Sequence, residues 1–268
     1  MLEYMILSFS FLLGLCFGSF ANVVIYRLPK GLSIVKPPSA CPFCNHRLAP
    51  FELIPVISWL FLRGKCRKCK KRISFRYPLV ELICGGLFAA MVCYSATLSA
   101  VPLMVLAFVL LVISFIDFDI QEIPDGLVII GAISGVFLVG GGHFFANNFY
   151  GARAWHDALL GVIAGAVPLL IIDRITLVLL KKDGFGYGDV KLMAMVGLFL
   201  GWRLMFVAFF LAFISGGAFA VYLIAAGKAK RGAYMPFGPF LCVGALLAFW
   251  FGESLLELYI GALAFNYI

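Results

Sequence analysis

Paired cysteines are the first residues of this sequence whose type and spacing could do chemistry. Cys41-Pro-Phe-Cys44 and Cys66-Arg-Lys-Cys69 form two C-x2-C pairs separated by 21 residues. Two such pairs supply four thiolates, the ligand set of a tetrahedral zinc site. Neighbouring cations, which help to keep thiolates ionised, are Arg67, Lys68, Lys70 and Lys71. The spacing therefore predicts a zinc site, with a redox pair or inert cysteines as the alternatives.

Aspartates at the edges of long apolar segments are the second such group. They are Asp117, Asp119, Asp125 and Asp189. Ionisable residues in such places are rare and usually functional. Two carboxylates at hydrogen-bonding distance share a proton and activate water, as in aspartic proteases. For Asp125 a helix cap is an alternative, and Asp119 is equally open to a structural interpretation.

The elements that position these residues are membrane-spanning helices. Of the 268 residues 63% are hydrophobic and 13% charged, whereas a soluble domain has roughly 45–50% apolar and ~25% charged residues. The surface of a soluble protein could not be covered by so few charges, and disorder requires low hydrophobicity. The composition therefore predicts an all-α polytopic membrane protein, and the net charge of +8 does not indicate nucleic acid.

About eight spans fit the apolar segments. The uncharged stretch 82–116 is too long for one span and is broken by Ser95, Thr97, Ser99 and Pro102, so it predicts two helices. Residues 189–226 are also assigned to two spans, with a turn near 201–203, and residues 143–157 to a polar loop. The remaining spans are expected at 4–26, 124–142, 158–180 and 237–260.

Charge orients these spans. Residues 27–76 carry 12 of the 21 Lys and Arg, and the loops expected on the same face bring the total there to 18, against two on the other face. Because cytoplasmic loops are enriched in Lys and Arg, residues 27–76 are expected to be a cytoplasmic four-cysteine domain, with both termini periplasmic. The predicted organisation is a first span (1–26), this insert (27–76) and a membrane domain of about seven helices (77–268).

Ordered motifs along nearly the whole chain resemble the bifunctional type IV prepilin peptidases, which are membrane aspartic proteases of the GxGD type. The resemblance includes Gly18-Ser19-Phe20, Arg76-Tyr77-Pro78 with Glu81, Asp117-Phe-Asp119, Gly186-Tyr187-Gly188-Asp189 with Lys191, and Pro236-Phe237-Gly238-Pro239. It also includes Asn22-Val23, Arg27-Leu28-Pro29, the paired C-x2-C insert with Ile54-Pro55 and Ser58-Trp59, and Ile123-Pro124-Asp125.

The resemblance implies an enzyme of the inner membrane. Its catalytic residues would be Asp117 and Asp189, and its supporting residues Asp119, Asp125, Gly186, Gly188 and Lys191. It would cut the basic leader of type IV prepilins or type II secretion pseudopilins and methylate the new N-terminus with S-adenosylmethionine. Zinc, S-adenosylmethionine and membrane lipids are the expected ligands and surroundings.

Two further expectations come from the residues themselves. Glu52 is the only carboxylate of the insert, so it is expected either to meet the incoming ammonium group in methyl transfer or to form an ion pair with a nearby cation. Asp189 opens a span beside Lys191 and Asp117 closes one, so the helix dipoles favour Asp189 as the base. Two other classes remain alternatives: a proton-coupled transporter and a non-catalytic zinc-containing scaffold.

Overall fold

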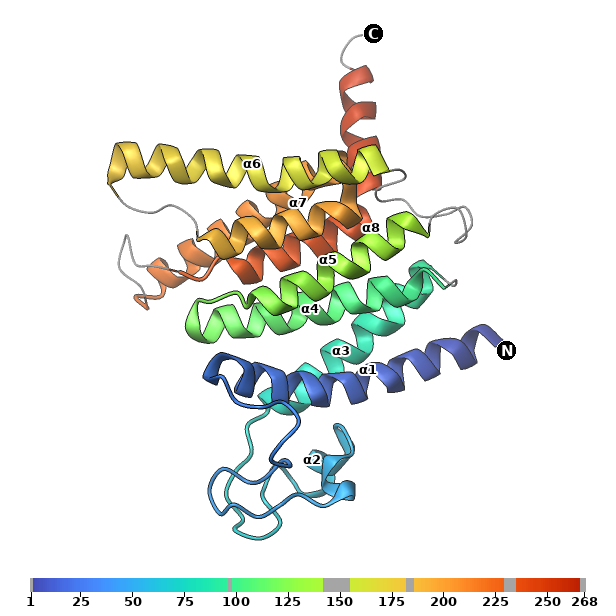
Figure 1. Cartoon of the computed structure of the whole chain (residues 1–268), viewed down its shortest axis with the longest axis vertical. Helices are drawn as coiled ribbons and strands as arrows, with labels where there is room; N and C mark the ends of the chain where they lie inside the picture. The colour runs from blue at the N-terminus through green and yellow to red at the C-terminus, as the bar shows by residue number, and fades with distance from the viewer. Residues whose placement is uncertain (1, 96–97, 142–154, 182–185, 229–234, 266–268) are drawn as a thin grey trace. The chain divides into compact units, whose positions relative to one another are not determined.

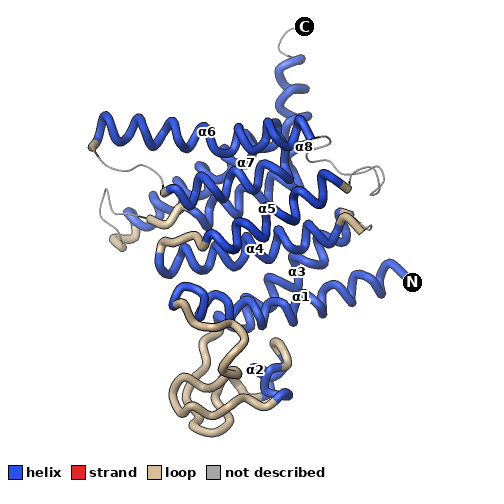
Figure 2. The backbone as a smooth tube through the Cα atoms, viewed as in Figure 1, coloured by secondary structure: helices blue, strands red, loops and turns tan. Residues whose placement is uncertain are grey.

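The protein is all-helical in the part of the chain that its computed structural model describes, which is residues 2–95, 98–141, 155–181, 186–228 and 235–265. Figure 1 shows the long helices, and Figure 2 shows that most of the described loop structure lies in the insert between α1 and α3. The elements are α1 (Leu2–Arg27), η1 (Leu28–Lys30), η2 (Pro50–Leu53), α2 (Ile57–Phe61), α3 (Arg76–Tyr94), α4 (Ala100–Ile120), α5 (Asp125–Gly140), α6 (Trp155–Leu180), α7 (Tyr187–Ala225) and α8 (Gly238–Phe265). The prediction of an all-α membrane protein is thereby confirmed.

Among the described residues, six helices are long and apolar enough to cross a membrane: α1, α3, α4, α6, α7 and α8. Helix α5 has 16 residues, about 24 Å at 1.5 Å per residue, which is shorter than a ~30 Å hydrocarbon core. The break predicted within 82–116 lies between Tyr94 and Ala100. Most of the loop predicted at 143–157 lies outside the described residues, and α6 already begins at Trp155.

The 39 residues of α7 form two helical segments that meet at Gly201, where φ is 69° and ψ is 173°. Only glycine adopts this conformation readily. A Cβ added at Gly165 of α6 would meet both Met193 and Met205, so the two segments lie alongside each other. The turn predicted near residues 201–203 is therefore present. The difference between the eight spans predicted and the six candidate spans of the described residues comes from α7, which holds two of the predicted spans, and from the shorter α5.

Two compact units divide the chain, Met1–Val112 and Ile113–Ile268. In the first, α1 packs on α3 through Gly14 and Gly18, where an added Cβ would lie 2.7 Å from the carbonyl oxygen of Cys84 and 2.5 Å from the Cα of Glu81. In the second, the contacts join α6 with α7, α7 with α8, and α5 with α7. The four-cysteine insert belongs to the first unit and the aspartates to the second.

Candidate active site and metal centre

Asp117 lies in the last turn of α4 and is 6% exposed. Its Oδ2 accepts a hydrogen bond of 3.0 Å from the backbone N–H of Gly238, the first residue of α8. A Cβ at position 238 would lie 2.7 Å from that oxygen, so glycine is what allows the contact. Because the N-terminus of a helix carries partial positive charge, the start of α8 is a favourable place for this carboxylate.

Asp189 lies in the first turn of α7 and is 9% exposed. The backbone N–H of Gly186, the residue before the helix, is hydrogen-bonded to its carboxylate, while the N–H of Asp189 donates to the carbonyl oxygen of Gly186 at 3.0 Å. A Cβ at Gly188 would lie 3.0 Å from that of Ile123. Glycine at 188 therefore lets the start of α7 approach the connection between α4 and α5.

The two carboxylates are close enough to interact electrostatically. Cys242, one turn along α8 from Gly238, interacts with both and is 1% exposed. Helices α4, α7 and α8 thus bring together two acidic groups from distant parts of the sequence in a buried place. Adjacent carboxylates in such a place cannot both ionise freely and share a proton, which is the arrangement that activates water in aspartic proteases.

Two of the supporting residues predicted around the pair, Lys191 and Asp125, contact each other. The Nζ of Lys191 lies 2.8 Å from Oδ1 of Asp125, which links α7 to α5. Their side chains are 49% and 64% exposed. Lys191 therefore pairs with Asp125, not with Asp189 as the sequence suggested, and Asp125 does not cap α5 through its side chain because its N-cap is Pro124. Asp119 lies exposed near the end of α4.

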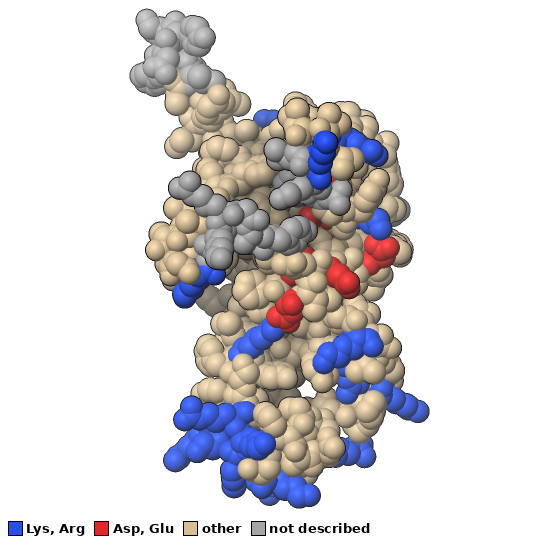
Figure 3. Space-filling model, turned by 90° about the vertical axis from the view of Figure 1, so that its left-hand side faces the viewer, with Lys and Arg blue, Asp and Glu red and all other residues tan. Residues whose placement is uncertain are grey.

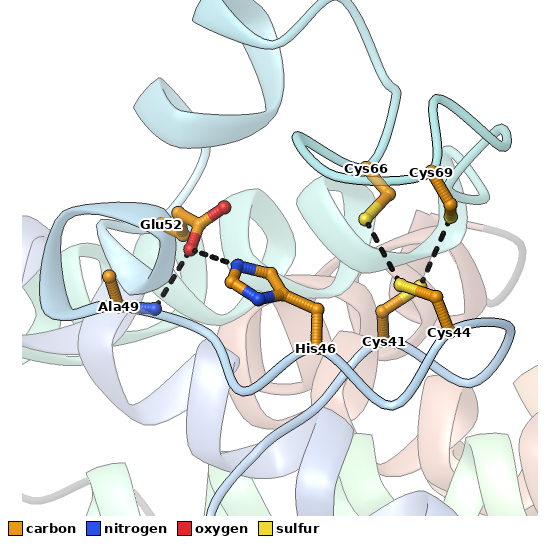
Figure 4. A network of polar contacts seen from close by, with 7 residues as sticks. All are labelled: Cys41, Cys44, His46, Ala49, Glu52, Cys66 and Cys69. Atoms are coloured by element: carbon orange, nitrogen blue, oxygen red, sulfur yellow. Dashed lines mark hydrogen bonds and ion pairs between the residues drawn. The ribbon is translucent and has the colours of Figure 1, made fainter.

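The four cysteines lie together in the insert, as Figure 4 shows. Their sulfur atoms all lie within 4.8 Å of one another, with Cys41 Sγ and Cys69 Sγ 3.8 Å apart and Cys44 Sγ and Cys66 Sγ 3.9 Å apart. Zn–S bonds of ≈ 2.3 Å in a tetrahedron place sulfur atoms about 3.8 Å apart. The donor set and its spacing therefore fit a tetrahedral metal ion.

The two C-x2-C segments have the same local structure. In each, the first cysteine accepts a backbone hydrogen bond from the residue after the second, Asn45 or Lys70, and that residue has positive φ, 53° or 58°. Antiparallel bridges close the two turns, Ala40 with Arg47 and Lys65 with Arg72. The hydrogen bond from the backbone N–H of Cys69 lowers the pKa of the Cys66 thiol to about 6, so this ligand ionises easily.

Glu52 is buried behind the first cysteine turn (Figure 4). Its side chain is 2% exposed, and its Oε2 accepts a hydrogen bond from the N–H of Ala49 at 2.9 Å and lies 3.4 Å from Nε2 of His46. Its Oε1 is buried without a hydrogen-bond partner in the described part of the chain. The basic side chain that lies beside Glu52 is thus the imidazole of His46.

Two contacts at these sites were absent from the sequence reasoning. Gly238, whose N–H donates to Asp117, belongs to the Pro236–Pro239 motif, and the sequence alone assigns no role to that motif. Glu81 of α3, 8% exposed, accepts a hydrogen bond of 2.7 Å from the N–H of Val56, and the Ser19 side chain also bonds to it. Both contacts join residues far apart in the chain, and only their presence in ordered motifs could have indicated them.

Known proteins match both units. A model described as the bacterial peptidase A24 N-terminal domain matches residues 12–95, and that of the type IV leader peptidase family matches residues 104–221. The chain is 35% identical to a prepilin leader peptidase/N-methyltransferase of Bacillus subtilis strain 168 over 261 residues, 95% of this chain and 98% of the relative. A Pseudomonas putida protein of the same name is 35% identical over 91% and 90% of the two chains. No solved structure matches the chain.

The fold and the family models define a multi-pass membrane peptidase. The chain belongs to the type IV leader peptidase family, since the relatives match it over nearly its whole length. The prediction of a peptidase with methyltransferase activity is thereby confirmed.

Proposed function

We propose that Asp117 and Asp189 form the catalytic pair and cut the basic leader of a type IV prepilin or a type II secretion pseudopilin. The observation that carries the proposal is the meeting of two buried carboxylates, each bonded to the N–H of a glycine at the start of a helix. The relatives named prepilin leader peptidase/N-methyltransferase support the substrate class. The four-cysteine insert is assigned to the cytoplasmic side because cytoplasmic loops are enriched in Lys and Arg.

In this mechanism one carboxylate removes a proton from water as the water oxygen attacks the scissile carbonyl carbon. The other carboxyl group donates its proton to the carbonyl oxygen. Collapse of the tetrahedral intermediate breaks the C–N bond, and the leaving nitrogen takes up a proton to become the new N-terminal amine. Asp189 is assigned the base because it opens α7, whereas Asp117 closes α4 and has only the neighbouring start of α8 to offset the negative end of its own helix. Gly186, where an added Cβ would meet nothing closer than 3.8 Å, leaves room for a peptide backbone beside the base, whereas Gly188 lets α7 pack against Ile123.

The cysteine cluster and the second activity concern the insert. Cys41, Cys44, Cys66 and Cys69 would hold zinc, which would cross-link the two turns. S-adenosylmethionine would supply the methyl group that the new N-terminal amine receives. Glu52 was a candidate for meeting that amine, but its buried side chain and its bonds to Ala49 and His46 favour the structural alternative.

Cleavage of a purified prepilin in detergent, with product masses read with and without S-adenosylmethionine, tests this function. We expect loss of the leader, and a gain of one methyl group only with the donor. Asp117→Asn and Asp189→Asn should each reduce cleavage by at least about 1,000-fold, and the double variant should lose little more, because the residues act as a unit. Glu257→Gln, at an exposed carboxylate of α8 outside the site, is the matched control. Substantial cleavage by either buried variant, at normal expression, would overturn the assignment of the pair.

A further inference from the structure

The insert carries an apolar surface that its own fold does not cover. Helix α2 follows η2 closely, and Ile57, Leu60 and Phe61 lie at the i, i+3 and i+4 positions that share one face of a helix. We call this face and the two residues after Glu52 the α2 platform; its members are 42, 44, 50, 60 and 84% exposed and are Leu53, Ile54, Ile57, Leu60 and Phe61. Contiguous exposed apolar residues of this kind mark an interaction site.

The other side of α2 explains why the platform faces outward. Trp59 donates a hydrogen bond from Nε1 to the carbonyl oxygen of Ile73 at 3.2 Å, and its ring packs edge-on to Phe75. Gly64, with φ of 63°, leaves room for that ring, since a Cβ there would lie 2.8 Å from it. The indole thus fixes the inner face of α2 against the insert and leaves the platform on the outer face.

Glu81 sets the depth of the platform. The N–H of Val56, the residue immediately before α2, donates to Glu81 Oε2 at 2.7 Å. Glu81 is the sixth residue of α3, about 8 Å along the helix from its start at 1.5 Å per residue. Helix α3 is a membrane-spanning candidate. The backbone at Val56, immediately before α2, is therefore held beside a membrane helix, at a level beyond the first turn of that helix.

This bond is made at a strained residue. Val56 has φ of 59° and ψ of −51°, a conformation that is a genuine outlier for a β-branched side chain. Such strain persists only where surrounding contacts over-determine it. Here the buried Glu81 carboxylate, also bonded by Ser19, holds the backbone, so the position of α2 is a fixed feature of the fold.

The charge of the insert selects the occupant. Residues 27–76 carry 12 Lys and Arg, while their single carboxylate, Glu52, is buried. Figure 3 shows the basic side chains gathered over this part of the molecule. Arg67 lies over the ring of Phe51 and Lys71 over that of Phe43, at 5.0 Å and 4.6 Å. Such a surface attracts anionic lipid headgroups and repels a basic peptide, such as the leader proposed as substrate.

We propose that the α2 platform inserts into the headgroup–acyl boundary of the leaflet that α3 enters, with the surrounding cations on anionic lipid headgroups. An amphipathic helix with a basic surround binds a bilayer in this way. The insert is then anchored to the bilayer at a third point, besides α1 and α3. This inference rests on the membrane helices and does not depend on the proposed catalysis.

Photo-crosslinking of the full chain in nanodiscs tests the proposal. A photoreactive amino acid replaces Phe61, and in a matched control it replaces Pro38, an exposed and uncharged residue of the insert outside both cysteine turns. The bilayer is an equimolar mixture of phosphatidylcholine and phosphatidylglycerol, and adducts are identified by mass. We expect lipid adducts at position 61 at several times the yield at 38, with phosphatidylglycerol favoured about fivefold, the effect of roughly one basic residue near the surface.

Two outcomes would overturn the proposal. Equal, low lipid labelling at both positions would place the platform in water, and transfer of the label from position 61 to an added prepilin would make it a substrate-docking surface. A second variant combines Glu81→Gln with the photoreactive residue at 61. Because both chains then carry the same label, a difference between them does not come from an effect of the label on folding. The Glu81→Gln chain should retain its metal but lose most of the lipid adduct, because the amide is a weaker acceptor for the Val56 N–H.

Discussion

At the scale of residues, the aspartate pair depends on glycines as much as on carboxylates. Asp117 and Asp189 each meet the N–H of a glycine at the start of a helix, α8 and α7 respectively. The start of a helix favours negative charge. From the sequence alone, helix dipoles favour only Asp189, because nothing in the sequence places the start of α8 beside Asp117. The two acids are thus more alike in surroundings than the sequence implied.

Replacing Gly238 with alanine should damage cleavage without unfolding the protein. The new Cβ would lie 2.7 Å from Oδ2 of Asp117 and would displace that carboxylate, and a misplacement of about 1 Å can cost roughly 100-fold in rate. The measurement is the rate of prepilin cleavage by purified variants. Gly217→Ala is the control, since a Cβ there meets nothing within 4 Å. A Gly238→Ala enzyme as fast as the control would contradict the role given to this glycine.

Removing both partners of the Asp125–Lys191 ion pair should harm the enzyme less than removing one. The pair is half-exposed, and such pairs contribute about 0–1 kcal/mol. Each single change, Lys191→Met or Asp125→Asn, leaves one charge unbalanced near the start of α7, so we expect losses in cleavage of less than about tenfold. The double variant should recover most of that loss. If the loss in the double variant instead equals the product of the two single losses, the two residues act independently.

At the scale of elements, helix pairs pack through small residues spaced four apart. Gly14 and Gly18 of α1 meet α3, Gly131 and Gly135 of α5 meet α7, and Gly161 and Gly165 of α6 meet α7. In lipid, where water provides no hydrophobic drive between helices, close backbone approach is what stabilises a pair. The glycines of α5 and α6 hold α7 in place and so position Asp189 at its start.

Gly165→Ala should therefore destabilise the fold. A Cβ at this position would collide with the carbonyl oxygen of Met193, which is backbone and cannot move aside like a flexible side chain. Overpacking of this kind costs about 1–3 kcal/mol. Thermal unfolding in a fixed detergent should show a lower Tm than for the wild type, while Gly126→Ala, which meets nothing within 4 Å, should leave it nearly unchanged. An unaltered Tm would mean that α6 is not held through this contact.

At the scale of the whole molecule, the two candidate sites lie in different compact units. The cysteine cluster belongs to Met1–Val112, and Asp117 and Asp189 belong to Ile113–Ile268. The family models make a similar division, with one match over residues 12–95 and another over 104–221. The predicted boundaries at residues 27 and 77 remain a prediction, although α1 ends at Arg27 and α3 begins at Arg76.

Metal removal should accordingly affect the two activities unequally. Native mass spectrometry of the purified chain should find one zinc ion, which Cys66→Ser or a chelator removes, because a four-thiolate site needs all its ligands. Cys93→Ser, a change of an exposed cysteine outside the cluster, should retain the metal. Leader cleavage should survive zinc loss better than methylation. A folded chain without metal, or equal loss of both activities, would contradict this division.

The sequence by itself determined the class of protein and its groups of reactive residues. Hydropathy and charge predict membrane helices because a hydrocarbon core leaves few alternatives to a helix, and the two C-x2-C pairs predict a metal site because their spacing is local. The turn at Gly201 could also be predicted, because residues 189–226 form an apolar stretch that is too long for one span.

Tertiary structure decided which distant residues meet. That Gly238 donates to Asp117, that Lys191 pairs with Asp125, and that Glu81 holds Val56 all depend on how helices pack side by side. Hydropathy fixes where a helix crosses the membrane, yet it carries no information on rotation about the helix axis or on the choice of neighbour. Those are set by close contacts between small residues and by the need of each buried carboxylate for a hydrogen-bond donor.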